Sequence, residues 1–444
     1  MDIKELYHLY QQHPCITTDS RDCPEGSIFL ALKGEKFDGN QYAEGALEKG
    51  CAYAIVDNPD VVKDHRYILV DNCLQTFKDI AREHRRQFNI PVIGITGTNG
   101  KTTTKELIKA VLSEKYNVLA TEGNFNNDVG VPKTLLRLNS EHEIAIIEMG
   151  ASHPGDIKTL AETAEPTCGL ITNVGRAHLQ GFGSFEGVIK TKCELYDFLR
   201  SREDSLIFIN ADNEHLIDQI SDDEEMWLSP YSTDPDNQYS CISGEVLECN
   251  PFLKFRWREP LMVLEEEGRS TKWHKVQTKL IGSYNIDNLL AAIAVGINFG
   301  VDRKKIVAAL EAYEPSNNRS QMTVTEKNHL IVDAYNANPS SMQAALENFK
   351  IMQADNKMAI LGAMRELGEV SAEEHQHVVD YLKTSDIKTV WLVGEEFEDT
   401  QCNFRKFKDV EEVKAAIAAE QPTGHYILIK GSNSTKLYQL PELL

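Results

Sequence analysis

The sequence predicts an α/β protein of two to three domains, built on parallel sheets that helices cover. Its 444 residues are too many for a single hydrophobic core. Short apolar strands alternate with amphipathic helices through much of the chain, and repeated β-α units are typical of parallel sheets. A glycine-rich turn at residues 97–102, between one such strand and helix, points to nucleotide binding.

Three segments of different character follow one another along the chain, and we expect the domain boundaries near their ends. The domains are predicted at 1–89, 90–314 and 315–444. The first segment mixes short strands with helices, which we expect at 27–32, 42–49, 52–56, 67–70 and 74–88.

The second segment begins with the glycine turn and continues as alternating strands and helices. Within it, residues 221–279 combine an acidic stretch, Pro and Asn turns and alternating runs, which predict an antiparallel insertion or edge. In the third segment, Ser371 with Glu374 predicts a capping box at a helix start. The strands and helices of that segment are expected at 330–334, 340–351, 358–361, 371–383, 390–393, 410–419 and 426–429.

Composition excludes several classes of protein. The formal net charge of −22 argues against a nucleic-acid-binding or anionic-membrane surface, because both require basic patches. Nine scattered cysteines, without a C-x-x-C pair, fit a reducing compartment better than a disulfide framework or a zinc site. The amino-terminal residues do not resemble a signal peptide and no apolar run reaches 18 residues, so we expect a cytoplasmic protein without membrane insertion.

Residues 92–104 read V-I-G-I-T-G-T-N-G-K-T-T-T, an apolar strand that runs through a glycine turn into a helix. Such a turn lets backbone N–H groups surround phosphate oxygens, while a lysine supplies a cation and a hydroxyl can ligate Mg²⁺. The loop is a shortened form, because Ile95 stands where the common form has its first glycine. The alternative is a glycine turn without a ligand. The residues expected to bind ATP here are Gly97, Thr98, Asn99, Gly100, Lys101, Thr102 and Thr103.

Further metal ligands are expected at the carboxyl ends of neighbouring strands, where ligands gather in open α/β sheets. Glu148 ends the buried run 143–150 and is a natural ligand for Mg²⁺. His178 follows the strand 169–172 in a loop, although a loop histidine is more often a surface residue than a ligand. Ser184 can cap a helix that carries Lys190 and Lys192, and spacing alone does not distinguish the two lysines.

Several motifs together resemble the Mur ligase family, whose ATP-dependent enzymes build the peptide stem of bacterial peptidoglycan. The motifs shared with the whole family are the phosphate loop, Glu148-Met-Gly, Asn173-x4-His178 and Lys192. The phosphate loop alone would equally fit an enzyme similar to folylpolyglutamate synthetase. Other stretches resemble the type that joins D-alanyl-D-alanine to UDP-N-acetylmuramoyl-tripeptide. They are 18–21, 38–39, 121–132, 333–342, and 362–368 with His375.

The resemblance implies three domains, namely a small mixed α/β domain for the UDP-sugar, a central parallel-sheet ATPase domain and a C-terminal Rossmann-like domain. It implies two Mg²⁺ ions, held by Thr102, Glu148, His178 and Lys192, with the lysine converted by carbon dioxide to a carbamate. Lys101, His178 and Lys192 would be catalytic. The resemblance places Asn285, Asn288, Arg319, Asp333 and Asn336 around ATP. It places Ser20, Arg21, Asn124, Asn126, Asn127 and Asn338 around the substrate.

The implied reaction forms an acyl phosphate on the terminal carboxylate of the tripeptide, which the free amine of the dipeptide then attacks. The partners are UDP-N-acetylmuramoyl-tripeptide and D-alanyl-D-alanine, with the protein acting as a monomer. One alternative is a Mur ligase that adds a single amino acid, although the expected Asp-Asn-Pro-Arg motif is replaced here by Asn-Ala-Asn-Pro at 336–339. A nucleotide-dependent switch that ligates nothing is the other. The sequence leaves open whether the third stem residue is lysine or diaminopimelate.

Overall fold

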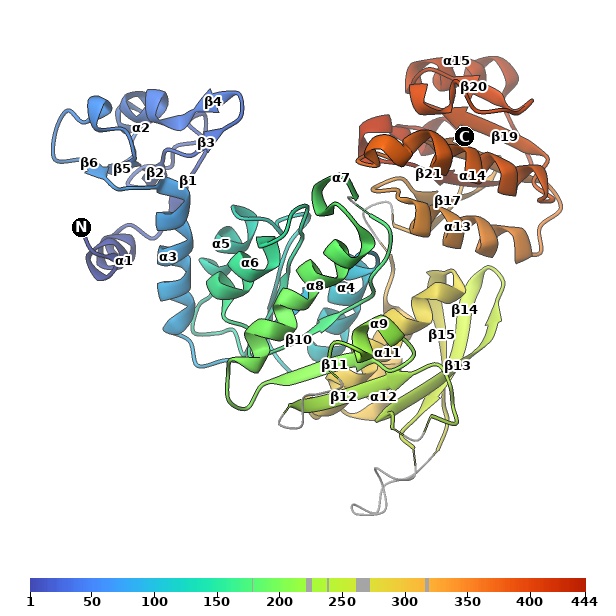
Figure 1. Ribbon diagram of the computed structural model, residues 1–444, viewed down its shortest axis with the longest axis horizontal. Helices are drawn as coiled ribbons and strands as arrows, with labels where there is room; N and C mark the ends of the chain where they lie inside the picture. The colour runs from blue at the N-terminus through green and yellow to red at the C-terminus, as the bar shows by residue number, and fades with distance from the viewer. Residues whose placement is uncertain (178, 221–225, 238, 261–271, 316–318) are drawn as a thin grey trace. The chain divides into compact units, whose positions relative to one another are not determined.

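The structure is a computed structural model that describes residues 1–177, 179–220, 226–237, 239–260, 272–315 and 319–444 (Figure 1). The chain divides into two compact units. The first comprises Met1–Gly94, Asn117–Gly150 and Asp156–Thr167, and the second comprises Ile95–Tyr116, Ala151–Gly155 and Cys168–Leu444. Within these described ranges, no helix is long and apolar enough to cross a membrane.

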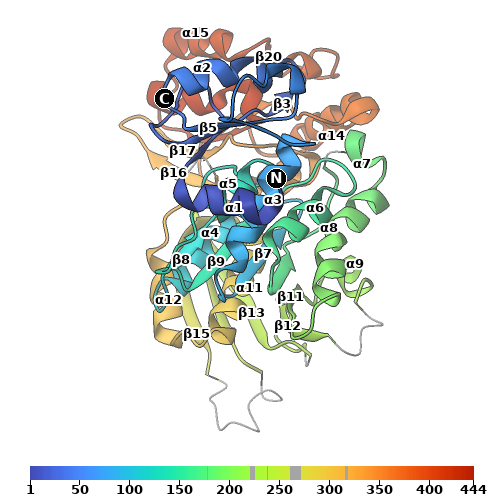
Figure 2. The ribbon, with the colours of Figure 1, turned by 90° about the vertical axis from the view of Figure 1, so that its left-hand side faces the viewer.

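A four-stranded parallel sheet, ordered β1-β2-β5-β6, lies in the first unit. Its buried side chains pack with those of α1, α2 and α3 into one core, and α1 lies beside α3 (Figure 2). The strands predicted at 27–32, 52–56 and 67–70 and the helices predicted at 42–49 and 74–88 are confirmed, whereas α1, β1, β3 and β4 were not predicted. The elements of this segment are α1 (Ile3–Gln12), β1 (Ile16–Thr17), β2 (Ile28–Leu30), β3 (Lys33–Gly34), β4 (Phe37–Asp38), α2 (Ala43–Glu48), β5 (Tyr53–Val56), β6 (Tyr67–Leu69) and α3 (Cys73–Arg86).

A nine-stranded sheet has the order β15-β14-β13-β12-β11-β10-β7-β9-β8. Strands β8 and β9 belong to the first unit and pair in parallel, while β10 to β15 belong to the second. The elements of the first unit are β8 (Val118–Ala120), α5 (Gly130–Leu135), β9 (Ile144–Glu148) and α6 (Asp156–Ala164). Those that follow or cross the division are β7 (Val92–Thr96), α4 (Lys101–Leu112), β10 (Cys168–Ile171), α7 (Leu179–Phe182), α8 (Phe185–Arg200), β11 (Leu206–Asn210), α9 (Glu214–Ile217), α11 (Ile286–Asn298) and α12 (Arg303–Ala312).

The predicted antiparallel edge is confirmed for the last three strands of this sheet. Strand β12 (Trp227–Ser232) still pairs in parallel with β11, and β13 (Ile242–Cys249) pairs in parallel with β12. The direction then reverses, because β14 (Phe252–Arg258) is antiparallel to both β13 and β15 (His274–Ile281). Parts of the predicted segment, at 221–225, 238 and 261–271, lie outside the described residues.

A six-stranded sheet in the second unit has the order β16-β17-β21-β18-β19-β20, in which only the β16–β17 pair is antiparallel. Successive side chains of a strand point to opposite faces, so neighbouring residues enter different cores. Ala359 and Leu361 pack with α13 and α14, whereas Met358 and Ile360 pack with α15. The elements are β16 (Gln321–Val324), β17 (His329–Asp333), α13 (Pro339–Ile351), β18 (Lys357–Gly362), α14 (Ser371–Lys383), β19 (Thr389–Val393), β20 (Arg405–Phe407), α15 (Val410–Glu420) and β21 (Tyr426–Lys430).

Two predicted helix starts have different outcomes. Ser184 caps α8 as predicted, because its Oγ accepts a hydrogen bond of 3.1 Å from the Gly187 N–H. The capping box predicted for Ser371 and Glu374 is wrong. Ser371 is itself the first residue of α14, and its Oγ lies 3.3 Å from Nδ1 of His375, one turn further along the helix. Beyond these details, the α/β class, the parallel sheets and the Rossmann-like C-terminal sheet are confirmed.

Candidate functional site

The predicted phosphate loop forms the turn between β7 and α4. Gly97 and Gly100 adopt φ angles of +140° and +78°, in a region that L side chains rarely enter. Gly97 also allows a close approach of two chain segments, because a Cβ at that position would lie 2.0 Å from Oγ1 of Thr172. Both glycines are therefore required by the backbone, as expected of a loop that must follow the outline of a phosphate.

The loop is fastened to the segment that follows β10. The Thr98 N–H donates to the Asn173 carbonyl at 2.9 Å, and the Asn99 N–H donates to Oδ1 of Asn173 at 2.9 Å. The Asn99 carbonyl accepts from Thr172 Oγ1 at 2.6 Å and from Asn173 Nδ2 at 3.1 Å. Oγ1 of Thr98 accepts from the Gly175 N–H at 3.0 Å. These bonds hold the loop backbone in one shape, and Asn173 contributes three of them, one through its backbone carbonyl and two through its side chain.

Lys101 is the first residue of α4, and its ammonium folds back over the loop. Its Nζ donates to the carbonyls of Gly97 at 2.6 Å and Thr98 at 3.0 Å. Both of these acceptors are neutral carbonyls, and the ammonium lies beside the amino-terminal end of a helix, where an anion is favoured. The hydroxyl-bearing side chain of Thr102 is buried in the first turn, and Thr103 is partly buried beside it.

Asn285 and Asn288 are brought together at the start of α11, behind the phosphate loop. Nδ2 of Asn288 donates to Oδ1 of Asn285 at 2.9 Å, and Oδ1 of Asn288 accepts from Oγ1 of Thr104 at 3.0 Å. A Cβ at Gly100 would lie 2.5 Å from Oδ1 of Asn288. Both side chains are buried. In this structure they therefore support the back of the loop, whereas the sequence resemblance places them around ATP.

The predicted metal carboxylate Glu148 lies in the first unit, at the carboxyl end of β9. It is buried, and its Oε1 accepts a hydrogen bond of 2.9 Å from Nδ2 of Asn126, one of the predicted substrate residues. Its N–H donates to Oγ1 of Thr121 at 3.0 Å. A buried carboxylate oriented by a neighbouring amide is a donor that suits Mg²⁺.

Burial distinguishes the two lysines that spacing did not. Lys192 is 2% exposed and its Nζ lies 5.2 Å from the centre of the Phe182 ring, whereas Lys190 is exposed on the same helix. His178 lies outside the described residues. Within the described part of the chain, no group of three or more His, Cys, Asp and Glu residues is placed to hold a metal. The metal set implied by the resemblance thus stays a prediction.

In the six-stranded sheet, Asp333 ends β17 and pairs with Lys430 at the end of β21, with Oδ2 and Nζ 2.5 Å apart. Their strands run in parallel with Asp333 opposite Lys430, so the pair lies at the carboxyl edge of the sheet. Asn336 is exposed and its Oδ1 accepts from the Ala337 N–H at 2.9 Å. The guanidinium of Arg319 stacks on Tyr335, 4.1 Å from the ring centre.

Asn338, which was predicted to bind substrate, makes its side-chain hydrogen bonds with other residues of the protein. It is the N-cap of α13, where its Oδ1 accepts from the Ser341 N–H at 2.8 Å. Its Nδ2 donates to Oδ1 of Asn99 in the phosphate loop, also at 2.8 Å. The structure therefore joins a residue predicted to bind substrate to a residue predicted to bind ATP.

The remaining predicted substrate residues lie in the first unit. Ser20 is partly buried and its carbonyl accepts from Nζ of Lys49 at 2.6 Å. Arg21 is exposed and pairs with Asp19, which holds the pKa of that carboxyl below its usual range. Asn124 is exposed, as is Asn127, whose Oδ1 accepts from the Gly130 N–H at 2.9 Å at the start of α5. No common binding surface for these residues follows from their hydrogen bonds.

Sequence reasoning missed Lys430 and the role of His375. The signal for Lys430 was a lysine directly after the apolar run 426–429, at the end of a predicted strand. His375 is buried in α14, where its Nε2 accepts from the Met364 N–H at 3.0 Å and its Nδ1 donates to the Ser371 carbonyl at 2.7 Å. Burial lowers the pKa of His375. The ring therefore stays neutral and holds the turn after β18 in place.

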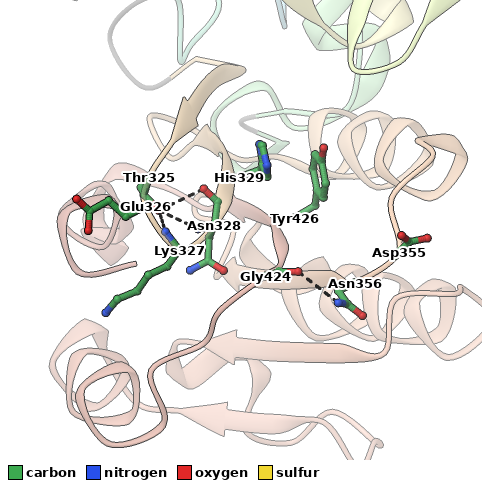
Figure 3. Close-up of a pocket in the computed structure, with 9 residues that line it drawn as sticks. All are labelled: Thr325, Glu326, Lys327, Asn328, His329, Asp355, Asn356, Gly424 and Tyr426. Atoms are coloured by element: carbon green, nitrogen blue, oxygen red, sulfur yellow. Dashed lines mark hydrogen bonds between the residues drawn. The ribbon is translucent and has the colours of Figure 1, made fainter.

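A hollow of about 290 Å³ lies at the opposite edge of the six-stranded sheet, where β17 and β21 begin (Figure 3). The rings of His329 and Tyr426 stack on one side of it, with centres 4.5 Å apart. Asn356 Nδ2 donates to the Gly424 carbonyl at 3.3 Å across its floor. Ligands of parallel α/β sheets bind outside the carboxyl ends of the strands, so this amino-end hollow is not part of the candidate site.

Comparison with known proteins identifies the family. Models described as "Mur ligase family, catalytic domain", "Mur ligase middle domain" and "Mur ligase, glutamate ligase domain" match residues 14–96, 95–296 and 318–433. The UDP-N-acetylmuramoyl-tripeptide--D-alanyl-D-alanine ligase of Bacillus subtilis is 31% identical, over 96% of this chain and 92% of that protein. The chain belongs to the Mur ligase family. As a Mur ligase it is an ATP-dependent ligase.

Solved Mur ligase structures have the same fold. A crystal structure of MurF from Acinetobacter baumannii, 29% identical, matches with a TM-score of 0.84 over 96% of this chain and 92% of that chain. The MurF ligase of Thermotoga maritima in complex with ADP, 26% identical, also matches with a TM-score of 0.84, over 97% of this chain and 96% of that chain. The predicted family and fold class are confirmed, and that relative binds a nucleotide.

Proposed function

We propose that this Mur ligase joins D-alanyl-D-alanine to UDP-N-acetylmuramoyl-tripeptide and converts ATP to ADP and phosphate. The observation that carries the proposal is the similarity, along almost the whole chain, to ligases that bear this name. The fastened loop Gly97–Thr102 supports it, because a cationic residue at the start of a helix is suited to a triphosphate.

An amide bond cannot form directly between a carboxylate and an amine at neutral pH, because the carboxylate is too poor an electrophile. In the proposed reaction the tripeptide carboxylate attacks the γ-phosphorus of ATP, the bond to the bridging oxygen breaks and ADP leaves. The free amine of the dipeptide then adds to the acyl phosphate. The tetrahedral intermediate loses phosphate and a proton, which leaves the amide.

In this reaction Lys101 would offset charge on the γ-phosphate as it moves toward an anionic carboxylate. Gly97, Thr98, Asn99 and Gly100 would surround the phosphates, with Thr102 and Thr103 in the first helical turn. Bound Mg²⁺ would neutralise phosphate charge and orient the reacting oxygens. Buried Glu148 and buried Thr102 fit the hard oxygen ligands that two such ions need.

Lys192 is the proposed carbamate. Carbon dioxide would form a bond to the neutral Nζ with loss of one proton, which turns a cation into an anionic oxygen ligand of the metal set that the resemblance implies, together with Glu148 and His178. The burial of Lys192, in contrast to exposed Lys190, supports the choice between them.

Other residues remain proposals on the strength of the resemblance. Arg319, Asp333 and Asn336 would approach ATP, as would Asn285 and Asn288 through their support of the loop. Ser20, Arg21, Asn124, Asn126 and Asn127 would contact the UDP-linked substrate. We further propose that the enzyme acts as a monomer in the cytoplasm.

A phosphate-release assay with purified protein, ATP and Mg²⁺ tests the function. We expect release only when UDP-N-acetylmuramoyl-tripeptide and D-alanyl-D-alanine are both present, with the amide product identified by mass spectrometry. Running the assay with lysine-containing and diaminopimelate-containing tripeptides identifies the preferred third residue. Release without acceptor and amine would favour a nucleotide-dependent switch. Faster ligation of free D-alanine would favour a Mur ligase that adds one amino acid.

A further inference from the structure

Asn338 connects two parts of the second unit through its side-chain amide. Its Oδ1 caps α13 by accepting from the Ser341 N–H, and its Nδ2 donates to Oδ1 of Asn99, both at 2.8 Å. Asn338 is 6% exposed and Asn99 is partly buried, so solvent has limited access to the bond between them. A buried amide hydrogen bond is expensive to break when a partner is left unsatisfied. The bond to Asn99 therefore constrains the distance between α13 and the phosphate loop.

Asn99 can receive this bond without changing its backbone contacts. Its N–H and its carbonyl are held by Asn173 and Thr172, whereas its side chain accepts from Asn338. The residues on either side, Thr98 and Gly100, belong to the turn expected to surround the phosphates. The position of the Asn99 side chain therefore also determines the position of the middle of the phosphate loop.

Near this hydrogen bond, the start of α13 and the segment that contains Gly175 lie close together. A Cβ at Gly175 would lie 3.1 Å from Oγ of Ser340, the second residue of α13. Gly175 also donates to Oγ1 of Thr98. The start of α13 therefore rests against the same segment that fastens the loop, and the Asn338–Asn99 bond fixes their mutual position.

We infer that Asn338 is a positioning residue for phosphate transfer, which holds the phosphate loop to α13 through Asn99 instead of contacting substrate itself. The inference rests on the proposed function for its kinetic effect, but the hydrogen bond has a consequence that does not depend on catalysis. Without the bond, the loop and the carboxyl edge of the six-stranded sheet would each keep their own structure, but their positions relative to each other would no longer be fixed.

A double-mutant cycle separates this role from capping. Asn338→Ser keeps a good N-cap but is too short to reach Asn99, and Asn99→Ala removes the acceptor while keeping the backbone bonds. We expect each variant to lower kcat by roughly fivefold, the size of one neutral hydrogen bond, with the KM for the UDP-linked substrate unchanged. The double variant should be no worse than either single variant. Multiplied effects, or a normal kcat in Asn338→Ser, would overturn the inference.

Asp409→Ala is the matched control for loss of a helix cap. Asp409 caps α15 by accepting from the N–H groups of Glu411 and Glu412, and α15 packs in a different core of the six-stranded sheet from α13. It should lower the melting temperature and leave kcat unchanged. An equal loss of kcat in this variant would show that general destabilisation explains the Asn338 result.

Amide hydrogen exchange of residues 97–104, measured without substrates, gives a readout that is independent of ligation. We expect faster exchange in Asn338→Ser and Asn99→Ala than in the wild type, and no change in Asp409→Ala. If the wild type ligates nothing, the proposed function falls while the exchange result still decides on the bond. Equal exchange in all four proteins would overturn the positioning role.

Discussion

Two strand-to-helix turns of this protein have similar topology but differ in the cap of the helix and in the partners of a nearby lysine. Between β7 and α4 the N-cap is Gly100, which has no side chain to cap the helix, and Lys101 is held by neutral carbonyls. Between β17 and α13 the N-cap is Asn338 in a capping box with Ser341, and the nearby Lys430 is paired with Asp333. The first helix therefore begins without a side-chain cap, which favours an anion there, while the second helix is capped by its own side chain and the nearby lysine is paired with a carboxylate.

The difference teaches that a lysine near a parallel-sheet edge is not by itself a phosphate site. Lys101 and Lys430 both lie at the carboxyl edges of their sheets, but Lys430 is paired with Asp333, whereas Lys101 donates to two loop carbonyls. A glycine N-cap leaves the first N–H groups of the helix without a side-chain cap, which favours an anion there. The predictions below test each half of this contrast.

The largest effect is expected for Lys101→Ala. Removing the cation should lower kcat by about 1,000-fold, because its charge acts on the transferring phosphate and not on packing. The melting temperature should stay within a few degrees of the wild type. Lys109→Ala, an exposed position on the same helix, should retain full activity. Substantial turnover by a folded Lys101→Ala protein would remove the loop from the active site.

The next effect concerns the proposed carbamate. Lys192→Ala should lower kcat by about 100-fold, since an oxygen ligand to a metal would be lost, and added formate should partly restore it. Lys190→Ala should behave as the wild type because that side chain is exposed. Mass spectrometry under bicarbonate should detect the added carbon dioxide on Lys192 only. Reversed behaviour of the two variants would contradict the assignment.

The phosphate loop could be predicted from sequence because its determinants are local. Gly97, Gly100 and Lys101 act through turn geometry and helix position, which a stretch of ten residues already contains. The strands and helices were predictable for the same reason. Ser371 shows the limit even for local patterns, because the N-cap of α14 is Val370, one residue before the position that the capping-box pattern predicts.

The partners of Asn338 and Asp333 could not be predicted in this way. Asn99 is 239 residues from Asn338, and Lys430 is 97 residues from Asp333. Which polar residues meet depends on strand order and on how helices pack, and neither is written in a local pattern. The same reason left Lys190 and Lys192 equivalent until burial distinguished them.

A smaller effect tests the neutralised turn. Asp333→Asn should destabilise the protein by about 3 kcal/mol, because Lys430, which is only 2% exposed in its side chain, would be left as a buried charge without its partner. Adding Lys430→Met should recover most of this loss. Urea unfolding measures both variants, with Glu411→Gln in the exposed Lys414 pair as the control. Unchanged stability of Asp333→Asn would instead favour a role for Asp333 in ATP binding alone.

The smallest effect concerns Asp287 on α11, the helix that supports the phosphate loop. Burial and, to a smaller extent, the neighbouring carboxylate of Asp212 raise the pKa of Asp287 to about 6, against the opposing effect of a hydrogen bond from Asn210. An unfolded aspartate has a pKa near 3.9. Because the folded value is the higher one, the protonated carboxyl stabilises the fold below about pH 4, and this contribution is lost as the pH rises through about 6.

Asp287→Asn imitates the protonated form at every pH. The variant should therefore equal the wild type in stability near pH 4 and exceed it by about 2 kcal/mol at pH 8. Urea unfolding at intervals between pH 4 and pH 8 measures the difference in stability. Asp355→Asn, at an exposed position, is the control and should show no such dependence on pH. The gain at pH 8 would show that an ionised carboxylate on α11 opposes folding. A stability difference that instead grew toward acid would mean that Asp287 is stabilised as an anion, and the helix behind the loop would then carry a paired charge, as the second turn does.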